Sequence, residues 1–103
     1  MTKDETSSSI HKKTLSLKSL PSIRQLRAFV AVYYTGSLSV AAEALSLTQP
    51  AVTVLLRELE DKLGVRLFDR TTRTLRRTEA AAEAIVFAER ALNELDAMSN
   101  SMQ

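Results

Sequence analysis

The chain has 103 residues, of which 45% are hydrophobic, so it is long enough for one domain with a small core. It contains no cysteine and one histidine, His11, in a polar stretch, which excludes a disulfide framework, a thiolate metal site and a cysteine nucleophile. No apolar run approaches the ~20 residues of a membrane span, and the N-terminus lacks the apolar core of a signal peptide. We therefore expect a cytoplasmic protein with no cofactor, no metal and no membrane contact.

The N-terminal part divides into a tail and a first helix. Residues 1–21 are rich in serine, threonine and lysine without sustained hydrophobic periodicity, which predicts a disordered tail. A helix is expected to open at Ser22, a capping residue type, and to end at Gly36. An apolar stripe at helical spacing predicts its buried face. The members of this stripe are Ile23, Leu26, Phe29, Val30 and Tyr33.

Residues 38–60 have the pattern of two helices joined by a tight turn. The first is expected from about Ser39 to Leu45, and the second from about Gln49 to Leu63, with Thr48 as its cap and Pro50 in its first turn. Four apolar residues step by four, three and four along the second helix and predict its inward face. They are Val52, Leu56, Leu59 and Leu63. This is the pattern of a helix-turn-helix, in which the second helix can enter a DNA major groove.

The outer face of the second helix carries the candidates for base contacts. Thr53, Val54 and Arg57 fall opposite the apolar stripe. An exposed valine is unusual there unless it contacts a thymine methyl group, and Gln49 can pair with adenine or bind a phosphate. The N–H groups at the start of a helix also favour a phosphate. The alternative for Gln49 and Thr53 is ordinary helix-start chemistry.

Residues 65–77 carry five arginines against one aspartate, a net charge of +4. Partial alternation over 65–70, a polar stretch at 71–74 and a short return at 75–77 predict a β-hairpin wing with a basic tip. Its arginines are candidates for phosphate contacts, with Arg73 the best candidate for the minor groove. They are Arg66, Arg70, Arg73, Arg76 and Arg77. The alternative is a merely solvated run of charge, which the neighbouring helix-turn-helix disfavours.

A last helix is expected after Thr78, its cap, with Glu79 and Glu83 near the positive end of the helix dipole. Its apolar stripe is longer than a small domain can cover, so we expect it to meet a second copy of the chain. The predicted dimerisation residues are Ile85, Ala88, Leu92, Leu95 and Met98. The alternative is that this helix folds back on its own domain.

From residue 23 to about residue 97 the chain resembles the N-terminal domain of LysR-type transcriptional regulators. The matching segments are 26–30, 36–42, 48–53, 59–60, 63–70 and 78–80. The resemblance implies a winged helix-turn-helix followed by a long linker helix that pairs with its counterpart. It also implies that Gln49, Pro50 and Thr53 approach DNA and that Arg73 enters or flanks the minor groove.

The chain departs from the family pattern at several points. Val54 stands where the family often has arginine, and Ala81 where it usually has glycine. Residues 1–21 are an added tail, and the effector-binding domain that normally follows the linker helix is absent from the chain, which ends at Gln103. A site for a small-molecule effector is therefore not expected in this chain.

The sequence thus predicts a mainly α fold. Residues 22–77 would form the winged helix-turn-helix, with three helices and a short hairpin, and residues 78–103 the linker helix. The predicted DNA-binding residues are Ser37, Thr48, Gln49, Pro50, Ala51, Thr53, Val54, Arg57, Arg66, Arg70, Thr72, Arg73, Arg76 and Arg77.

The expected function is sequence-specific binding of double-stranded DNA by a homodimer. The alternative is a truncated interaction protein that pairs through its linker helix with a full-length regulator. An enzyme is disfavoured because the chain lacks cysteine, a second histidine and a glycine-rich phosphate loop.

Overall fold

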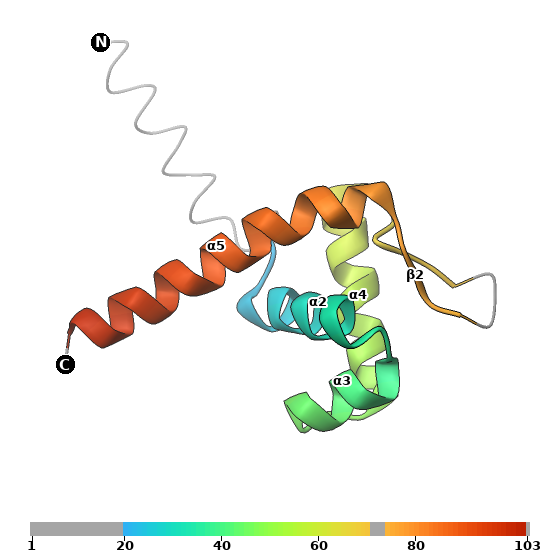
Figure 1. Cartoon of the computed structure of the whole chain (residues 1–103), viewed down its shortest axis with the longest axis horizontal. Coiled ribbons are helices and arrows are strands. Elements are labelled where there is room, and N and C mark those ends of the chain that lie inside the picture. Colours follow the sequence, from blue (N-terminus) through green and yellow to red (C-terminus); the bar gives the residue numbers. More distant parts are fainter. Residues whose placement is uncertain (1–19, 71–73, 103) are drawn as a thin grey trace, which may run out of the picture.

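The computed structural model describes residues 20–70 and 74–102 (Figure 1). The elements in chain order are α2 (Ile23–Thr35), α3 (Leu38–Leu45), α4 (Gln49–Leu63), β1 (Phe68–Asp69), β2 (Arg76–Arg77) and α5 (Glu79–Ser101). Helix α2 packs against α3, α4 and the first part of α5, and the rest of α5 extends away from the other helices. The predicted mainly α architecture, with three helices, a short hairpin and a long last helix, is confirmed.

The helix boundaries follow from local sequence. Each described helix begins after a serine or threonine whose hydroxyl accepts the backbone N–H three residues further on. These caps are Ser22, Ser37, Thr48 and Thr78. Gly36 and Gly64 end α2 and α4 in the left-handed conformation, with φ of 68° and 71°. The predicted caps and glycine ends of α2 and α4 and the cap of α5 are confirmed, whereas α3 begins at Leu38 because Ser37 caps it.

The core lies where α2, α4, β1 and the start of α5 meet. Phe29 is fully buried there and contacts Phe68 of the wing edge-to-face, with ring centroids 5.9 Å apart. Val52, Leu56 and Leu59 of α4 are also fully buried, which confirms three members of the stripe predicted for that helix. The wing is therefore packed into the same core as the helix-turn-helix.

Two predicted inward residues lie outside this core. Ile23 is 52% exposed because the buried face of α2 is displaced from the predicted stripe. The buried residues of α2 are Gln25, Ala28, Phe29 and Val32. Leu63, the last residue of α4, is 41% exposed because it lies past the main core. It lines an apolar groove with Leu26 of α2 and Phe87 of α5.

The last helix contributes differently along its length. Ala81, Ile85 and Ala88 are buried in the domain, whereas Leu95 and Met98 are 38% and 57% exposed. The prediction that Ile85 and Ala88 contact a second copy is therefore wrong, because the core of their own chain already covers them. The alternative weighed for this helix holds for its first part only.

Within the described residues, no single helix has the length and apolar composition needed to cross a membrane. Only the pair α3–α4 passes that test, when its two helices are added together, although a bend of 100° separates them.

Candidate nucleic-acid interface

The helix-turn-helix is formed by α3 and α4, which cross at 100°. Residues 46–48 make the turn: Ser46 adopts the left-handed conformation with φ 57°, and the Leu47 N–H donates to the carbonyl of Ala42 at 2.8 Å. Thr48 then caps α4 by accepting the Ala51 N–H at 3.2 Å. Pro50 lies in the first turn of α4, where a backbone N–H has no partner within the helix, so the N–H that proline lacks is not needed there. The turn therefore fixes where α4 begins and which face it presents.

Most of the outer face of α4 is exposed. Gln49, Pro50 and Arg57 are exposed, Val54 is 53% exposed, and Thr53 is half-buried. The apolar stripe on the opposite side holds α4 on the core, so these outward side chains are presented by a rigid helix. The predicted separation of the two faces holds for the buried Val52, Leu56 and Leu59 and for the exposed Val54 and Arg57.

The hairpin lies beside this outer face. β1 and β2 are antiparallel, with Phe68 opposite Arg77 and Asp69 opposite Arg76, and they are shorter than the strands that the sequence predicts. Arg57 of α4 lines the same hollow of about 410 Å³ as Arg66 and Arg70 of the wing segment. The second helix of the motif and the wing therefore share one continuous side of the molecule.

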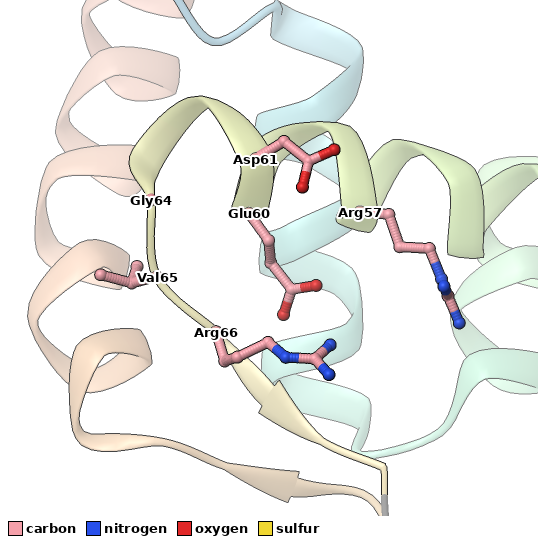
Figure 2. A pocket seen from close by; sticks show the side chains of 6 residues that line it. All are labelled: Arg57, Glu60, Asp61, Gly64, Val65 and Arg66. Carbon is pink, nitrogen blue, oxygen red and sulfur yellow. The ribbon is translucent and has the colours of Figure 1, made fainter.

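Figure 2 shows a second open hollow, of about 460 Å³, between α4 and the segment before β1. Arg57 and Arg66 reach it from these two elements, and both are exposed. Glu60 and Asp61 of α4 lie beside them. Two arginines on one shallow surface can engage neighbouring phosphates, while the acids limit how much free positive charge the hollow carries.

The wing arginines have different environments. Arg66, Arg76 and Arg77 are exposed, and the guanidinium of Arg77 lies over the ring of Tyr33, 4.6 Å from its centroid. The predicted positions Thr72 and Arg73 lie outside the described residues.

Arg70 differs from the expectation of a phosphate contact. Its side chain is only 18% exposed, and its Nη1 donates to Glu60 Oε1 at 3.2 Å. Its Nε and Nη2 are buried without a hydrogen-bond partner among the described residues. The physical reason is Glu60, whose carboxylate holds the guanidinium inward against the base of the wing.

The capping hydroxyls among the predicted residues are already engaged. Ser37 accepts the Val40 N–H at 3.2 Å and Thr48 accepts the Ala51 N–H. A hydroxyl that accepts can still donate, so Thr48 retains one proton for a phosphate oxygen, whereas the Ser37 hydroxyl also shares a hydrogen bond of 3.2 Å with the Ser39 hydroxyl. Ala51 is half-buried at the start of α4.

The tyrosines have structural partners. Tyr33 is half-buried and contacts Phe29 edge-to-face at 5.9 Å. The Tyr34 hydroxyl donates to the Glu89 carboxylate on α5, and this hydrogen bond raises the pKa of Tyr34 above its ordinary value of 10.0. These contacts place Tyr33 against the aromatic core and join Tyr34 to α5.

Sequence reasoning missed three residues that shape the surface. Gln25 is 5% exposed, forms a capping box with Ser22, and donates to Glu58 of α4 at 3.3 Å. Glu60 is equally buried, and Phe87 on α5 is 63% exposed. The Ser22–Gln25 spacing could have revealed the capping box. No local sequence pattern predicts that Glu60 is buried or that Phe87 is exposed.

The arrangement defines a winged helix-turn-helix with an outward-facing second helix. The sequence profile described as "Bacterial regulatory helix-turn-helix protein, lysR family" matches residues 23–82. The chain belongs to the LysR family of bacterial regulatory helix-turn-helix proteins.

Two curated relatives illustrate the similarity. One is an uncharacterised HTH-type transcriptional regulator of Azotobacter vinelandii, 49% identical over 74 residues, covering 72% of this chain and 51% of that protein. The other is the HTH-type transcriptional regulator CrgA of Neisseria meningitidis, 44% identical over 78 residues, covering 76% of this chain and 26% of that protein. The chain therefore matches about half of the first relative and about a quarter of the second.

Two solved structures share the fold. The DNA-binding domain of BenM in complex with catB site 1 DNA superposes with a TM-score of 0.74 at 31% identity, covering 79% of this chain and 91% of that chain. Oxidised OxyR of Corynebacterium glutamicum superposes with a TM-score of 0.76 at 32% identity, covering 82% of this chain and 27% of that chain.

Proposed function

We propose that the chain binds double-stranded DNA in a sequence-specific manner as the DNA-binding part of a LysR-type transcriptional regulator. The observation that carries the proposal is the open outer face of α4, with Val54 exposed between Gln49 and Arg57, on the same side as the basic wing. The likeness to the BenM domain, which was solved on DNA, supports it. The role involves binding and no reaction, and its place is the cytoplasm, where bacterial DNA lies.

The proposal includes two kinds of contact, those of α4 in the major groove and those of the arginines with phosphates and the minor groove. The first turns of α4 lie in the major groove, where Val54 contacts a thymine methyl group and Gln49 and Thr53 contact base edges or phosphates. Arg57, Arg66, Arg76 and Arg77 neutralise phosphates, and Arg73 reaches the minor groove. Arg70 is left out of the contact set because Glu60 holds it.

The proposal includes a homodimer built on α5. Four exposed apolar residues of this helix follow helical spacing, and the first two of them line the apolar groove of about 400 Å³ that Leu63 and Leu26 also line. They are Phe87, Ala91, Leu95 and Met98. This stripe replaces the predicted set in part: Leu95 and Met98 stay, Phe87 and Ala91 are added, and Leu92 is half-buried at its edge.

A second candidate uses the same stripe without DNA. A chain that matches about a quarter of CrgA could pair through α5 with a longer regulator and alter its assembly. The exposure of Phe87, at 63%, is the observation that favours a partner on α5.

Selection of bound duplexes from a random pool, followed by anisotropy titration of the selected site, tests the function. Gln49→Ala should cost ~1–3 kcal/mol at one base position if its contact is bidentate, and Val54→Ala should weaken the preference for one thymine. Glu43→Gln, at an exposed position of α3, is the control substitution. Selection of no common site, or identical site preferences for the wild type and both variants, would contradict the proposal.

A further inference from the structure

The wing strand is held between the second helix of the motif and the last helix by a short series of polar contacts. Glu60 of α4 is 5% exposed, and its Oε2 accepts the N–H of Leu67 at 2.8 Å and that of Phe68 at 3.3 Å. Its other oxygen takes the ion pair with Arg70. A carboxylate on α4 therefore fixes the backbone at the start of β1.

The opposite side of the same backbone is fixed to α5. The Thr78 hydroxyl donates to the carbonyl of Arg66 at 2.6 Å, and the carbonyl of Leu67 lies 3.2 Å from the same hydroxyl. The Thr78 N–H also donates to the Leu67 carbonyl, at 3.0 Å. The same hydroxyl accepts the Ala81 N–H and so caps α5. Leu67 thus gives its N–H to α4 and its carbonyl to the first residue before α5.

α4 and α5 both pack into the common core, but their backbones make little direct contact with each other. Each packs mainly against α2, and an apolar groove separates the end of α4 from Phe87. The two strands have only two residues each, and so short a hairpin has little stability of its own. The polar contacts at Leu67 therefore add a hydrogen-bonded connection between α4 and α5 to the core that both helices share.

We propose that Glu60 and Thr78 are positioning residues that join α4 to α5 through Leu67, and that this joint sets the spacing between the two DNA half-sites that a dimer accepts. The inference rests on the proposed function, because it requires α4 to read DNA and α5 to pair. A rigid joint fixes the distance and rotation between the two reading helices of the dimer. A loose joint lets each α4 adjust to a displaced half-site.

The first measurement needs no DNA. The chain has no cysteine, so spin labels can be placed at Asp61→Cys on α4 and Asn93→Cys on α5, both exposed positions. With labelled chain diluted in unlabelled chain, pulsed electron paramagnetic resonance should give one narrow distance distribution. Thr78→Val, which removes the hydroxyl at nearly constant shape, should broaden it, whereas Thr78→Ser should restore it. Ser22→Ala, which removes the cap of α2, is the control for loss of a cap alone.

The second measurement uses duplexes carrying two copies of the half-site selected by the wild type, with spacers varied in steps of one base pair. Half a helical turn, about 5 base pairs, turns the second half-site to the other side of the DNA, so the wild type should lose about tenfold or more in affinity there. Thr78→Val should reduce that discrimination to about threefold or less, with its affinity for a single half-site retained. If circular dichroism shows that Thr78→Val does not fold, Glu60→Gln carries the test, with Glu83→Gln as its charge-matched control.

The possible outcomes distinguish failure of the joint between α4 and α5 from failure of the proposed dimeric DNA binding. An unchanged distance distribution in a folded variant overturns the joint, and a broadened distribution with the wild-type spacing profile overturns its link to spacing. A wild type that binds no duplex, or binds every spacing equally, contradicts the proposed dimeric DNA binding and with it the spacing role. The label distances still report then on whether Thr78 holds α5.

Discussion

Ser46 is the one non-glycine residue with a positive φ in the described part of the chain. Its φ of 57° and ψ of 41° place it in the left-handed region, which costs a residue with a Cβ roughly 1–2 kcal/mol. It adopts this conformation because its N–H and that of Leu47 satisfy carbonyls at the end of α3. The tight turn of the motif is therefore obtained at some loss of stability.

Ser46→Gly should stabilise the domain by about 0.5–1 kcal/mol, because glycine adopts the left-handed conformation without a steric penalty. Urea denaturation followed by circular dichroism measures the change. Ser39→Gly, at an exposed position inside α3, is the matched control and should destabilise by about 0.5–1 kcal/mol. Loss of stability in Ser46→Gly would mean that the serine hydroxyl contributes more than the backbone strain costs.

Tyr34 gives the domain a pH dependence on the alkaline side. The hydrogen bond to Glu89 holds the phenol neutral and raises the pKa of Tyr34 above 10.0, and the negative charge of Glu89 acts in the same direction. Because the folded pKa is the higher one, the stability that this contact adds is fully present below 10.0 and is lost as pH rises through the folded pKa. Glu89→Gln should therefore bring the pKa of Tyr34 back toward 10.0.

Tyrosinate absorbance in a Tyr33→Phe background measures this pKa directly, because the chain has only two tyrosines. Circular dichroism over the same range confirms that the fold persists during the titration. An equal tyrosinate midpoint with and without Glu89→Gln would exclude the hydrogen bond to α5 in solution.

At the scale of elements, the ends of helices could be predicted and the contacts between helices could not. Caps such as Thr48 and Thr78 act within three residues, so a local pattern contains all the information. The partners of Glu60 are seven to ten residues away, beyond the end of its helix, so its burial depends on the chain turning at Gly64. The environment of Arg70 could not be predicted for the same reason, because its charge is visible in the sequence and its partner is not.

The apolar stripe of α5 illustrates a second limit. Helical spacing predicts which residues share a face, but it does not say which chain covers them. Ile85 and Leu95 belong to one broad stripe in the sequence, yet Ile85 is 5% exposed and Leu95 is 38% exposed. Which part of the stripe is buried by its own chain depends on how far the core extends along α5, and the sequence pattern does not give that length.

Two arginines of the wing segment should have different effects, Arg70 on the stability of the domain and Arg76 on its affinity for DNA. Arg70→Ala leaves Glu60 buried without its ion-pair partner and should destabilise the domain by about 2 kcal/mol. Arg76→Ala removes an exposed cation and should change stability by less than about 0.5 kcal/mol. If Arg76 contacts one phosphate, its removal should lower the salt slope of DNA binding by roughly one unit.

Urea denaturation and anisotropy titrations over a range of salt concentrations measure the two quantities for both variants. Arg70→Ala should keep the wild-type salt slope under conditions in which it is folded. An Arg70→Ala variant of normal stability with a reduced slope would return Arg70 to the DNA surface.

At the scale of the whole molecule, the surfaces proposed for DNA binding and for dimerisation lie on opposite parts of the fold. The wing segment 65–77 carries a net charge of +4, whereas residues 78–103 carry five acids against Arg90, a net charge of −4. Figure 1 shows the hairpin and the free end of α5 pointing away from each other. A negative, partly apolar helix is repelled by DNA and is suited to a protein contact, which agrees with the proposed dimer.

Leu95→Asp should convert the proposed dimer into a monomer. Leu95 is partly exposed on the apolar stripe of α5, and a twofold axis places the new charge in the interface twice. Each copy loses the burial of a leucine, about 1.5–3 kcal/mol, and gains an unpaired charge in an apolar contact. The variant should keep its helical content, because Leu95 lies outside the buried core of its own chain.

Asn93→Asp adds the same charge to the opposite face of α5 and is the matched control. Analytical ultracentrifugation at micromolar concentration should show a dimer for the wild type and the control and a monomer for Leu95→Asp, which should bind paired half-sites no better than a single one. A wild-type monomer, or equal dissociation of both variants, would leave the stripe of α5 without the role proposed for it.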